Sequence, residues 1–339
     1  MDITRSTVTK IECLGEVDDY VYDISVAGQD PVFFANDILV KNTDSSYFSA
    51  WPMIKDQVAA KEAEWDKDIC VDIYKNITEQ VNSSFPAMME KSFHCPRANG
   101  SLIKGGLDLV AITGLFITKK RYAVLEYYLD GTRLDQLDKA TAEKKGIIPN
   151  IGKVKAMGLD LKRSDTPKKV QEFLSDVLLA VLTSQEKDAI FTKITDFKTK
   201  FAKLDSWEKG TPKRVNNLTK YSTNEEIEGK TNMPGHVRAA MNWNVLRKMH
   251  GDNYSMKIID GMKTIVCKLA ANPMGYKAVA YPIDEKHLPK WFKTLPFDDK
   301  LMEETIVTKK VENLLGVLNW DITNETRINS TFKSLFSFE

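Results

Sequence analysis

Cysteine is scarce in this chain of 339 residues, which holds only four cysteines, all far apart in the sequence. No C-x-x-C pair occurs, and the chain is far longer than the small secreted domains that disulfides hold together. We therefore expect neither a structural zinc site nor a disulfide framework. This use of cysteine suits a reducing cytoplasm.

Long apolar runs are also missing. The longest mostly apolar stretches, such as Leu107–Ile117, fall far short of the roughly 20 residues that a helix needs to cross a bilayer. The first residues do not resemble a signal peptide, because they lack a basic start, an apolar middle and a small-residue cleavage site. We therefore expect a soluble intracellular protein with no membrane partner.

No charge of one sign dominates the whole chain, since 48 Lys and Arg residues balance 47 Asp and Glu residues. The distribution is uneven, however. Residues 1–42 carry three basic and eight acidic groups, whereas residues 119–169 carry thirteen basic and seven acidic groups. Any attraction to a nucleic acid must therefore be local. The length and the 42% hydrophobic content suffice for two or three domains with cores of their own.

The spacing of apolar residues predicts the secondary structure. Residues 32–40 form two short strands around an Asn-Asp turn, in an all-β module too small to hold a core alone. From Asp66 to Phe85, apolar residues recur every four positions, which predicts a helix that Pro86 interrupts. Further along we expect strands at Leu107–Ile117 and Arg121–Leu129, helices from Pro167 to Leu182 and from Ile190 to Leu204, and an extended tail at Thr326–Glu339.

Two blocks near the start carry a more specific pattern. Val21–Val26 reads Val-Tyr-Asp-Ile-Ser-Val, and residues 32–43 read Val-Phe-Phe-Ala-Asn-Asp-Ile-Leu-Val-Lys-Asn-Thr. Together they resemble the C-terminal block of an intein. The resemblance implies that Asn42 cyclises onto its own carbonyl carbon and cleaves the bond to Thr43, whose hydroxyl accepts an acyl group. It also implies that Asp23 donates or accepts a proton and so couples these steps.

Two positions depart from the intein pattern. Lys41 replaces the usual penultimate His, and Pro31-Val32 replaces the His-Asn that precedes the Phe pair. Assistance to the cyclisation of Asn42 must then come from elsewhere. Because only 42 residues precede the junction, we expect a split intein whose other half ends a separate polypeptide. For residues 41–45 taken alone, the alternative is a polar hairpin turn.

The residues after the junction, Thr43–Ser49, resemble the second half of the Tyr-Gly-Asp-Thr-Asp-Ser palm motif of family B DNA polymerases. In that family, carboxylates on a hairpin hold two Mg²⁺ ions that assist nucleotidyl transfer from a dNTP. Asp44 matches the second Asp of the motif, as a catalytic residue and metal ligand. The Tyr-Gly-Asp is absent and would end the partner polypeptide. We therefore expect a DNA-directed DNA polymerase that is inactive until it is joined to that partner.

A second motif of the same family follows about 75 residues later. Lys119, Lys120, Arg121 and Tyr122 resemble the Lys-Lys-Arg-Tyr motif, whose basic cluster contacts primer-template DNA. Ammonium and guanidinium groups aimed at phosphates position a duplex without reading its sequence. The alternative for these four residues is a solvated basic turn.

Several later segments resemble the thumb of the polymerases of T-even-type phages. These segments are Met157–Gln171, Gly235–Ala239 and Asn272–Pro282. Within them, His236 and Arg238 are equally well explained as contacts to the DNA backbone or as a structural pair.

The last ten residues, Ser330–Glu339, resemble the C-terminal peptide by which these polymerases dock on a sliding clamp. Its apolar anchors are Phe332, Leu335 and Phe336, which suit a pocket on a partner protein. The alternative is a tail that folds back onto its own domain.

The predicted fold is therefore multidomain. It combines an all-β intein (Hint-type) fragment, an α+β polymerase palm portion and a mainly α-helical thumb. The expected boundaries are 1–42 for the intein piece, 43–160 for the palm portion, 161–325 for the thumb and 326–339 for the clamp-binding tail.

The predicted function is that of the C-terminal part of a split replicative DNA polymerase. Protein trans-splicing joins it to its N-terminal part, and the product extends primers in the cytoplasm of a phage-infected bacterial cell. One alternative is a non-enzymatic DNA- and clamp-binding subunit that assembles non-covalently, with an intein remnant inactivated by Lys41 and Pro31. Another is a self-processing β module with an unrelated passenger, which requires the polymerase similarities to be accidental.

Overall fold

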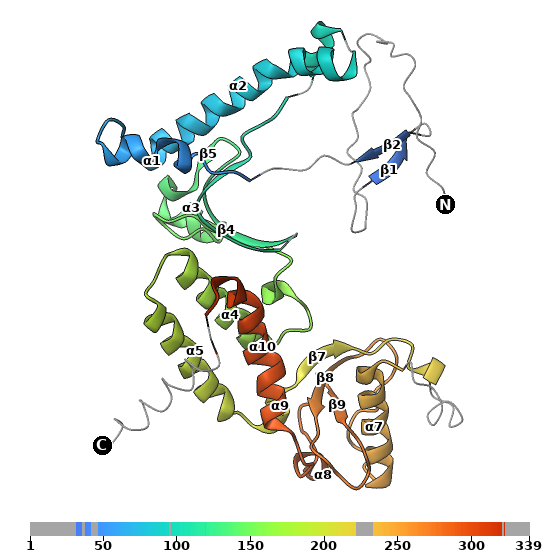
Figure 1. Ribbon diagram of the computed structural model, residues 1–339. Coiled ribbons are helices and arrows are strands. Elements are labelled where there is room, and N and C mark those ends of the chain that lie inside the picture. Colours follow the sequence, from blue (N-terminus) through green and yellow to red (C-terminus); the bar gives the residue numbers. More distant parts are fainter. Residues whose placement is uncertain are drawn as a thin grey trace, which may run out of the picture. The chain divides into compact units, whose positions relative to one another are not determined.

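The computed structural model describes residues 32–35, 38–41, 47–94, 96–102, 104–118, 120–221, 233–320 and 322. The chain divides into two compact units, Met1–Val110 and Ala111–Glu339 (Figure 1). The predicted boundaries after residues 42, 160 and 325 follow the family resemblances and stay predictions.

A small hairpin occurs in the first unit. Strand β1 (Val32–Ala35) pairs antiparallel with strand β2 (Ile38–Lys41), so that Val32 lies opposite Lys41. The two short strands expected at residues 32–40 are thus confirmed. Since β2 ends at Lys41, the predicted splice junction comes one residue after the end of the hairpin.

Two helices follow in the same unit, α1 (Trp51–Ala59) and α2 (Lys67–Phe93). The side chain of Asp66 caps α2, because its carboxylate accepts a hydrogen bond of 2.8 Å from the backbone N–H of Ile69. A second hydrogen bond links the start of α1 to α2, since the hydroxyl of Tyr74 accepts from the N–H of Ala50 at 3.0 Å.

The prediction that Pro86 interrupts this helix was wrong, because α2 continues through Pro86 to Phe93. Proline removes one helical hydrogen bond, but its fixed φ still suits a helix. The short helix η1 (Arg97–Leu102) packs closely against this point. A Cβ atom on Gly100 would lie only 2.5 Å from the Cα of Pro86, so only glycine allows this approach.

The second unit contains a four-stranded sheet in which β4 is central. Strand β4 runs antiparallel to β6, with Tyr122 opposite Met157 and Glu126 opposite Lys153. The strand expected at Arg121–Leu129 is confirmed. The bounds of the strands are β3 (Leu109–Thr118), β4 (Arg121–Leu129), β5 (Thr132–Arg133) and β6 (Lys153–Met157).

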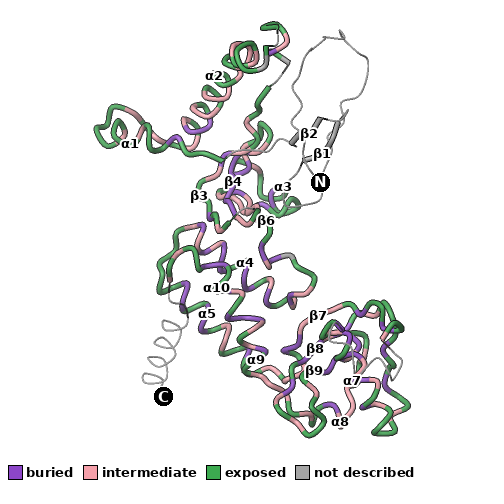
Figure 2. The backbone as a smooth tube through the Cα atoms, turned by 45° about the vertical axis from the view of Figure 1, so that its right-hand side comes forward, coloured by how far each residue is buried: buried purple, intermediate pink, exposed green. Residues whose placement is uncertain are grey.

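Helices pack against one another beside this sheet, and buried residues recur along them (Figure 2). The apolar face of α4 is almost completely buried, and Val170, Val177 and Leu178 have no exposed surface. They share one core with Ala123 and Leu125 of β4. The helices expected from Pro167 and from Ile190 are confirmed. The bounds are α4 (Lys168–Leu182), α5 (Lys187–Ala202), α9 (Asp299–Glu303), a π-helical turn (Glu304–Thr308) and α10 (Lys309–Leu315).

A second sheet occurs in the part of the chain for which we expect a mainly α-helical thumb, beyond the two helices predicted from the sequence. Its order is β7-β8-β9, all antiparallel, and α7 packs against β9 (Figure 1). These strands are short and interspersed with Lys and Pro, so they lack clear alternation. The bounds are β7 (Thr211–Arg214), α7 (Gly235–Met249), β8 (Lys263–Lys268), β9 (Ala278–Pro282) and α8 (Lys290–Lys293).

The remaining short elements connect these parts. They are η2 (Leu134–Gln136), α3 (Lys139–Lys144), η3 (Asp160–Lys162), η4 (Ser206–Lys209), η5 (Thr219–Tyr221) and η7 (Gly316–Leu318). Within the described ranges, no helix is both long and apolar enough to cross a membrane.

Candidate nucleic-acid interface

The turn between β3 and β4 carries the predicted basic motif. Lys120 is exposed and adopts a left-handed backbone conformation, with φ of 63°. Gly158 lies directly against it, since a Cβ atom on Gly158 would stand 2.2 Å from the carbonyl oxygen of Lys120. Gly158 itself has φ of 65°. Glycine is therefore required twice over at this position, by conformation and by space. Lys119 lies outside the described residues.

An aromatic pair stands beside this turn. The rings of Phe116 and Tyr122 are stacked, with centroids 5.7 Å apart, and the Phe116 ring also lies over Gly114. Met157 is directly opposite Tyr122 in the register, so it belongs to the same face of the sheet. Phe116 is 50% exposed and Met157 is 49% exposed. This end of the face is therefore accessible to a ligand.

Two lysines of β6 extend the same face. Lys155 is two residues from Met157 and opposite Val124, and Lys153 is opposite Glu126. Alternation along a strand sends Lys153, Lys155 and Met157 to one side. We call Lys120, Phe116, Tyr122, Lys155 and Met157 the basic–aromatic face. Lys153, further along β6 and opposite Glu126 in the register, is left out of this set.

The other face of the sheet is anchored in the core. Leu115, Ala123 and Leu125 are buried there, in contact with the core of the helices. The hydroxyl of Thr113 also donates a short hydrogen bond to the carbonyl of Leu182 at the end of α4. The basic–aromatic face is thus presented by a rigid support.

Arg121 belongs to this second face, unlike Tyr122 beside it in the motif. It is half-buried and lines a small hollow together with Asp160 of η3 and Lys310 of α10. The structure therefore places residues of the predicted DNA-binding motif on different faces of the sheet. It places Tyr122 on the accessible face and directs Arg121 toward the base of the helices.

An ionic network lies near this hollow, at the start of α4. Arg163 donates two hydrogen bonds to Asp165, at 3.0 and 3.1 Å, and Lys213 of β7 donates a third at 2.8 Å. Lys310 donates to the hydroxyl of Thr166 at 2.9 Å. The hydrogen bond from Arg163, supported by that from Lys213, holds the pKa of Asp165 well below its usual value against the effect of burial. This network ties β7 and α10 to the start of α4.

Asp165 should make the stability of the chain depend on pH. A depressed folded pKa stabilises the protein fully above the ordinary value of 3.8, and this contribution is lost only as the pH falls through the lower pKa of the folded protein. We expect Asp165→Asn to lower the free energy of unfolding at about pH 7, and to have a smaller effect at about pH 2. Urea denaturation across this range measures both effects.

Asp176 supplies the matched control. It is exposed on α4 and forms no ion pair within the described residues. Asp176→Asn should change the stability little at either pH. A destabilisation by Asp165→Asn that is the same at both pH values would contradict an electrostatic role for the network.

His236 and Arg238 are placed at the start of α7. His236 is half-buried, and burial together with the charge of Lys213 lowers its pKa. It is therefore a neutral imidazole at neutral pH, which is a poor partner for a phosphate. Arg238 is exposed, and no hydrogen bond joins it to His236 in the described part of the chain. The prediction of a structural pair is thus not supported by direct contact.

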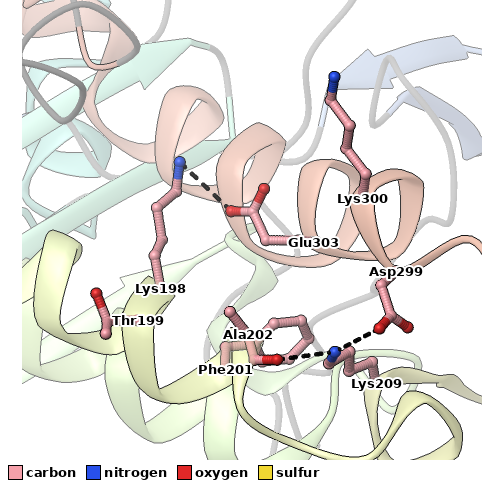
Figure 3. Close-up of a pocket in the computed structure, with 8 residues that line it drawn as sticks. All are labelled: Lys198, Thr199, Phe201, Ala202, Lys209, Asp299, Lys300 and Glu303. Atoms are coloured by element: carbon pink, nitrogen blue, oxygen red, sulfur yellow. Dashed lines mark hydrogen bonds and ion pairs between the residues drawn. The ribbon is translucent and has the colours of Figure 1, made fainter. Parts of the chain in front are cut away.

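A hollow of about 490 Å³ lies between α5 and α9 (Figure 3). Its charges pair with one another. Lys209, which is almost fully buried, donates to Asp299 at 2.8 Å and to the carbonyl of Ala202 at 3.0 Å, and Lys198 lies 3.4 Å from Glu303. Figure 3 shows Lys300 directed away from both pairs. The hollow is a charged helix junction, in which four of the five charged lining side chains form two ion pairs.

Comparisons with known proteins show similarity to DNA polymerases. The chain is 27% identical to the DNA-directed DNA polymerase of Escherichia phage RB69 over 255 residues, or 72% of its own length. It is 30% identical to the DNA-directed DNA polymerase of Enterobacteria phage T4 over 180 residues, or 53% of its length. The chain is similar to DNA polymerases.

A third similarity, to the DNA polymerase of Thermococcus hydrothermalis, has 26% identity over 188 residues and covers 56% of the chain. All three matches cover small parts of these relatives: 26% of the RB69 protein, 18% of the T4 protein and 8% of the Thermococcus protein. No family model matches the chain.

Most of the other predicted site residues lie outside the described residues. They are Asp23, Asn42, Thr43 and Asp44, for splicing and metal binding, and Phe332, Leu335 and Phe336, for the clamp. Among the described residues, no group of three or more His, Cys, Asp or Glu side chains is arranged to hold a metal ion. These assignments stay predictions.

Sequence reasoning missed three members of the basic–aromatic face. Phe116 was expected only within a strand, Lys155 only within a basic stretch and Met157 only at the start of a thumb-like segment. The alternation Lys-Val-Lys-Ala-Met at residues 153–157 was the available indication, since it places both lysines on one side of a strand. Which strand they pair with is visible only in the fold.

Proposed function

We propose that this chain is the C-terminal part of a DNA polymerase and that its basic–aromatic face contacts primer-template DNA. The similarity to a phage DNA polymerase over 72% of the chain carries the proposal. The arrangement of the face supports it. A lysine on a tight turn and a second lysine across the sheet flank a rigid aromatic pair.

The face suits a duplex held without regard to its sequence. Lys120 and Lys155 provide ammonium groups for phosphates, and such contacts position DNA rather than read its bases. The stacked rings of Phe116 and Tyr122 offer apolar surface to sugars or base edges. Because the opposite side of the sheet is anchored in the core, the DNA would meet a surface of fixed shape.

The DNA contact can be tested with the chain alone. We expect the double variant Lys120→Ala, Lys155→Ala to weaken binding to a primer-template duplex. The plot of log K against log salt concentration should become shallower by roughly 2, because each lost phosphate contact removes about 0.9 from its slope. Fluorescence anisotropy with a labelled duplex at several salt concentrations measures this.

Lys286→Ala is the control for loss of charge. Lys286 is exposed on the loop that follows β9, outside the basic–aromatic face. Removing its charge should leave the salt dependence nearly unchanged. If the double variant and Lys286→Ala weaken binding equally, the basic–aromatic face has no special role in holding DNA.

We further propose that the chain is joined to the rest of the polymerase by protein trans-splicing at the Asn42–Thr43 bond. The intein-like blocks support this, and so does the hairpin of β1 and β2, which ends at Lys41. The partner polypeptide would carry the N-terminal part of the polymerase, followed by the N-terminal part of the intein.

The proposed chemistry uses Asn42 and Thr43 at the junction, together with Asp23 and a cysteine of the partner's intein part. The Thr43 hydroxyl attacks the thioester that links the partner's polymerase part to its intein cysteine, and the thiol leaves with the proton. The side-chain amide of Asn42 then attacks its own carbonyl carbon and breaks the peptide bond to Thr43, which frees the amine of Thr43. That amine takes the acyl group from the oxygen, and a normal peptide bond results. Asp23 would move protons between these steps.

After joining, Asp44 and carboxylates from the partner would together hold Mg²⁺, which supplies charge compensation for nucleotidyl transfer from a dNTP. The anchors Phe332, Leu335 and Phe336 would dock on a sliding clamp. One observation favours a second candidate function, a non-enzymatic DNA- and clamp-binding subunit with an inactive intein remnant: Lys41 stands where inteins usually have a His. The splicing variants discussed below separate these two functions.

A further inference from the structure

The helices α1 and α2 have almost no core of their own. In the described residues 47–110, only Ala50, Cys70, Val71, Gly100 and Val110 are buried. Helix α2 is 27 residues long, yet only two of these buried residues belong to it. Most of the stability of a protein helix comes from packing its apolar face. Among the described residues, these two helices therefore have little of the packing that stabilises a helix.

The uncovered residues are large and apolar. Phe48 is 59% exposed, Trp51 42%, Met53 82%, Val81 44% and Met88 43%. We call these five residues the α1–α2 apolar surface. Single exposed apolar residues are ordinary, but four members of this set lie on α1 and α2, which the Ala50–Tyr74 hydrogen bond joins. The fifth, Phe48, precedes α1 and packs edge-on against Tyr74 of α2. The set therefore has the character of an interface.

The charge of this segment decides between two classes of partner. Residues 47–93 contain five Lys and Arg residues and eight Asp and Glu residues. A net negative segment repels DNA, in contrast to the basic stretch at residues 119–169. A protein partner is therefore favoured. The polymerases that the chain resembles extend well beyond it, since the match covers only 26% of the RB69 protein.

We propose that the α1–α2 apolar surface binds the N-terminal polymerase polypeptide before splicing, so that the polymerase parts themselves help to hold the two precursors together. This inference rests on the proposed function. The surface begins five residues after Thr43, so a polypeptide bound there has its end close to the junction along the chain. Raising the local concentration of the two ends would speed their reaction.

The test uses the full chain and the full partner polypeptide. For binding, Asn42→Ala in this chain and alanine at the first residue of the partner's intein part prevent joining, and sedimentation velocity then measures the Kd. We expect Val81→Asp and Met88→Asp each to weaken binding by about tenfold or more, because each places a charge in an apolar contact. Without the blocking substitutions, the same two changes should slow ligation at limiting concentration.

Gln80→Asp is the matched control, since Gln80 is exposed on α2 and receives the same charge one residue from Val81. It should change the Kd less than about twofold. Circular dichroism confirms that each variant keeps its helices. Equal binding by Val81→Asp, Met88→Asp and Gln80→Asp would overturn the proposal. The proposal would also be overturned if this chain self-associated without the partner and Val81→Asp abolished that self-association. The α1–α2 apolar surface would then bind a second copy of the chain.

The outcomes separate this proposal from the splicing reaction. Suppose that the natural chains ligate, and that Val81→Asp and Met88→Asp have the same ligation rate and Kd as Gln80→Asp. The docking proposal is then wrong, and the splicing proposal stands. If no ligation occurs, but a complex forms that Val81→Asp weakens, splicing fails and docking stands. If neither ligation nor a complex is found, both proposals are overturned.

Discussion

Thr43→Ala is expected to abolish the ligated product when this chain is mixed with its N-terminal partner. Alanine has no hydroxyl, so no acyl group can leave the thioester for residue 43. The loss should be complete rather than partial, because no neighbouring group can take this role without changing the register of the junction. Mass spectrometry and gels of the mixture measure the product, whose mass is the sum of the two polymerase parts.

Asn42→Ala provides the informative comparison. Acyl transfer to Thr43 still occurs in this variant, but the bond after residue 42 cannot be cleaved by cyclisation. A branched ester should accumulate, and the intein piece should stay attached. Under the alternative of an inactive intein remnant, neither substitution changes the behaviour of the mixture, and the two polypeptides form only a non-covalent complex. Normal ligation by Thr43→Ala would exclude the splicing proposal.

Gly158→Ala is expected to have the largest effect on stability among the changes discussed. A left-handed backbone costs a residue with a Cβ about 1–2 kcal/mol. The added Cβ would also stand 2.2 Å from the carbonyl oxygen of Lys120, so the backbone must move. We expect a total loss of about 3 kcal/mol or more in the free energy of unfolding. Thermal and urea denaturation measure this.

Gly146→Ala separates the two causes. Gly146 has φ of 64°, nearly that of Gly158, but a Cβ atom there would meet no atom within 4 Å. Its substitution should cost only the conformational strain of about 1–2 kcal/mol. Because the clash moves the Lys120 turn, Gly158→Ala should also weaken DNA binding, whereas Gly146→Ala should not. Equal losses of stability in the two variants would show that the close approach to Lys120 does not matter.

The elements with strong local patterns were predicted well. The strand at Arg121–Leu129 and the helix ending at Leu182 agree with the structure, because their apolar residues recur with one clear period. The helix end predicted at Pro86 was wrong, because α2 continues through Pro86 and Gly100 packs against that residue. The sheet of β7, β8 and β9 was missed because its strands are short and because β8 and β9 are packed by α7, a contact that no local pattern shows.

In the candidate site, too, some features could be predicted from the local sequence and others depend on tertiary packing. The Lys-Lys-Arg-Tyr motif is visible as four adjacent residues, but alternation along β4 sends Arg121 and Tyr122 to opposite faces of the sheet. Lys155 and Met157 reach the basic–aromatic face only because β6 pairs with β4 in one register. A shift of one residue would have sent both side chains to the opposite face.

Residue types and their order were enough to predict the similarity to polymerases and to propose the chemistry of the junction, because these depend on functional groups that are adjacent in the chain. Tertiary structure alone decided which lysines share a face with the aromatic pair, how Gly158 holds the turn, and that α1 and α2 keep apolar residues uncovered. Each of these depends on which distant segments pack together, and local periodicity contains no information about that choice.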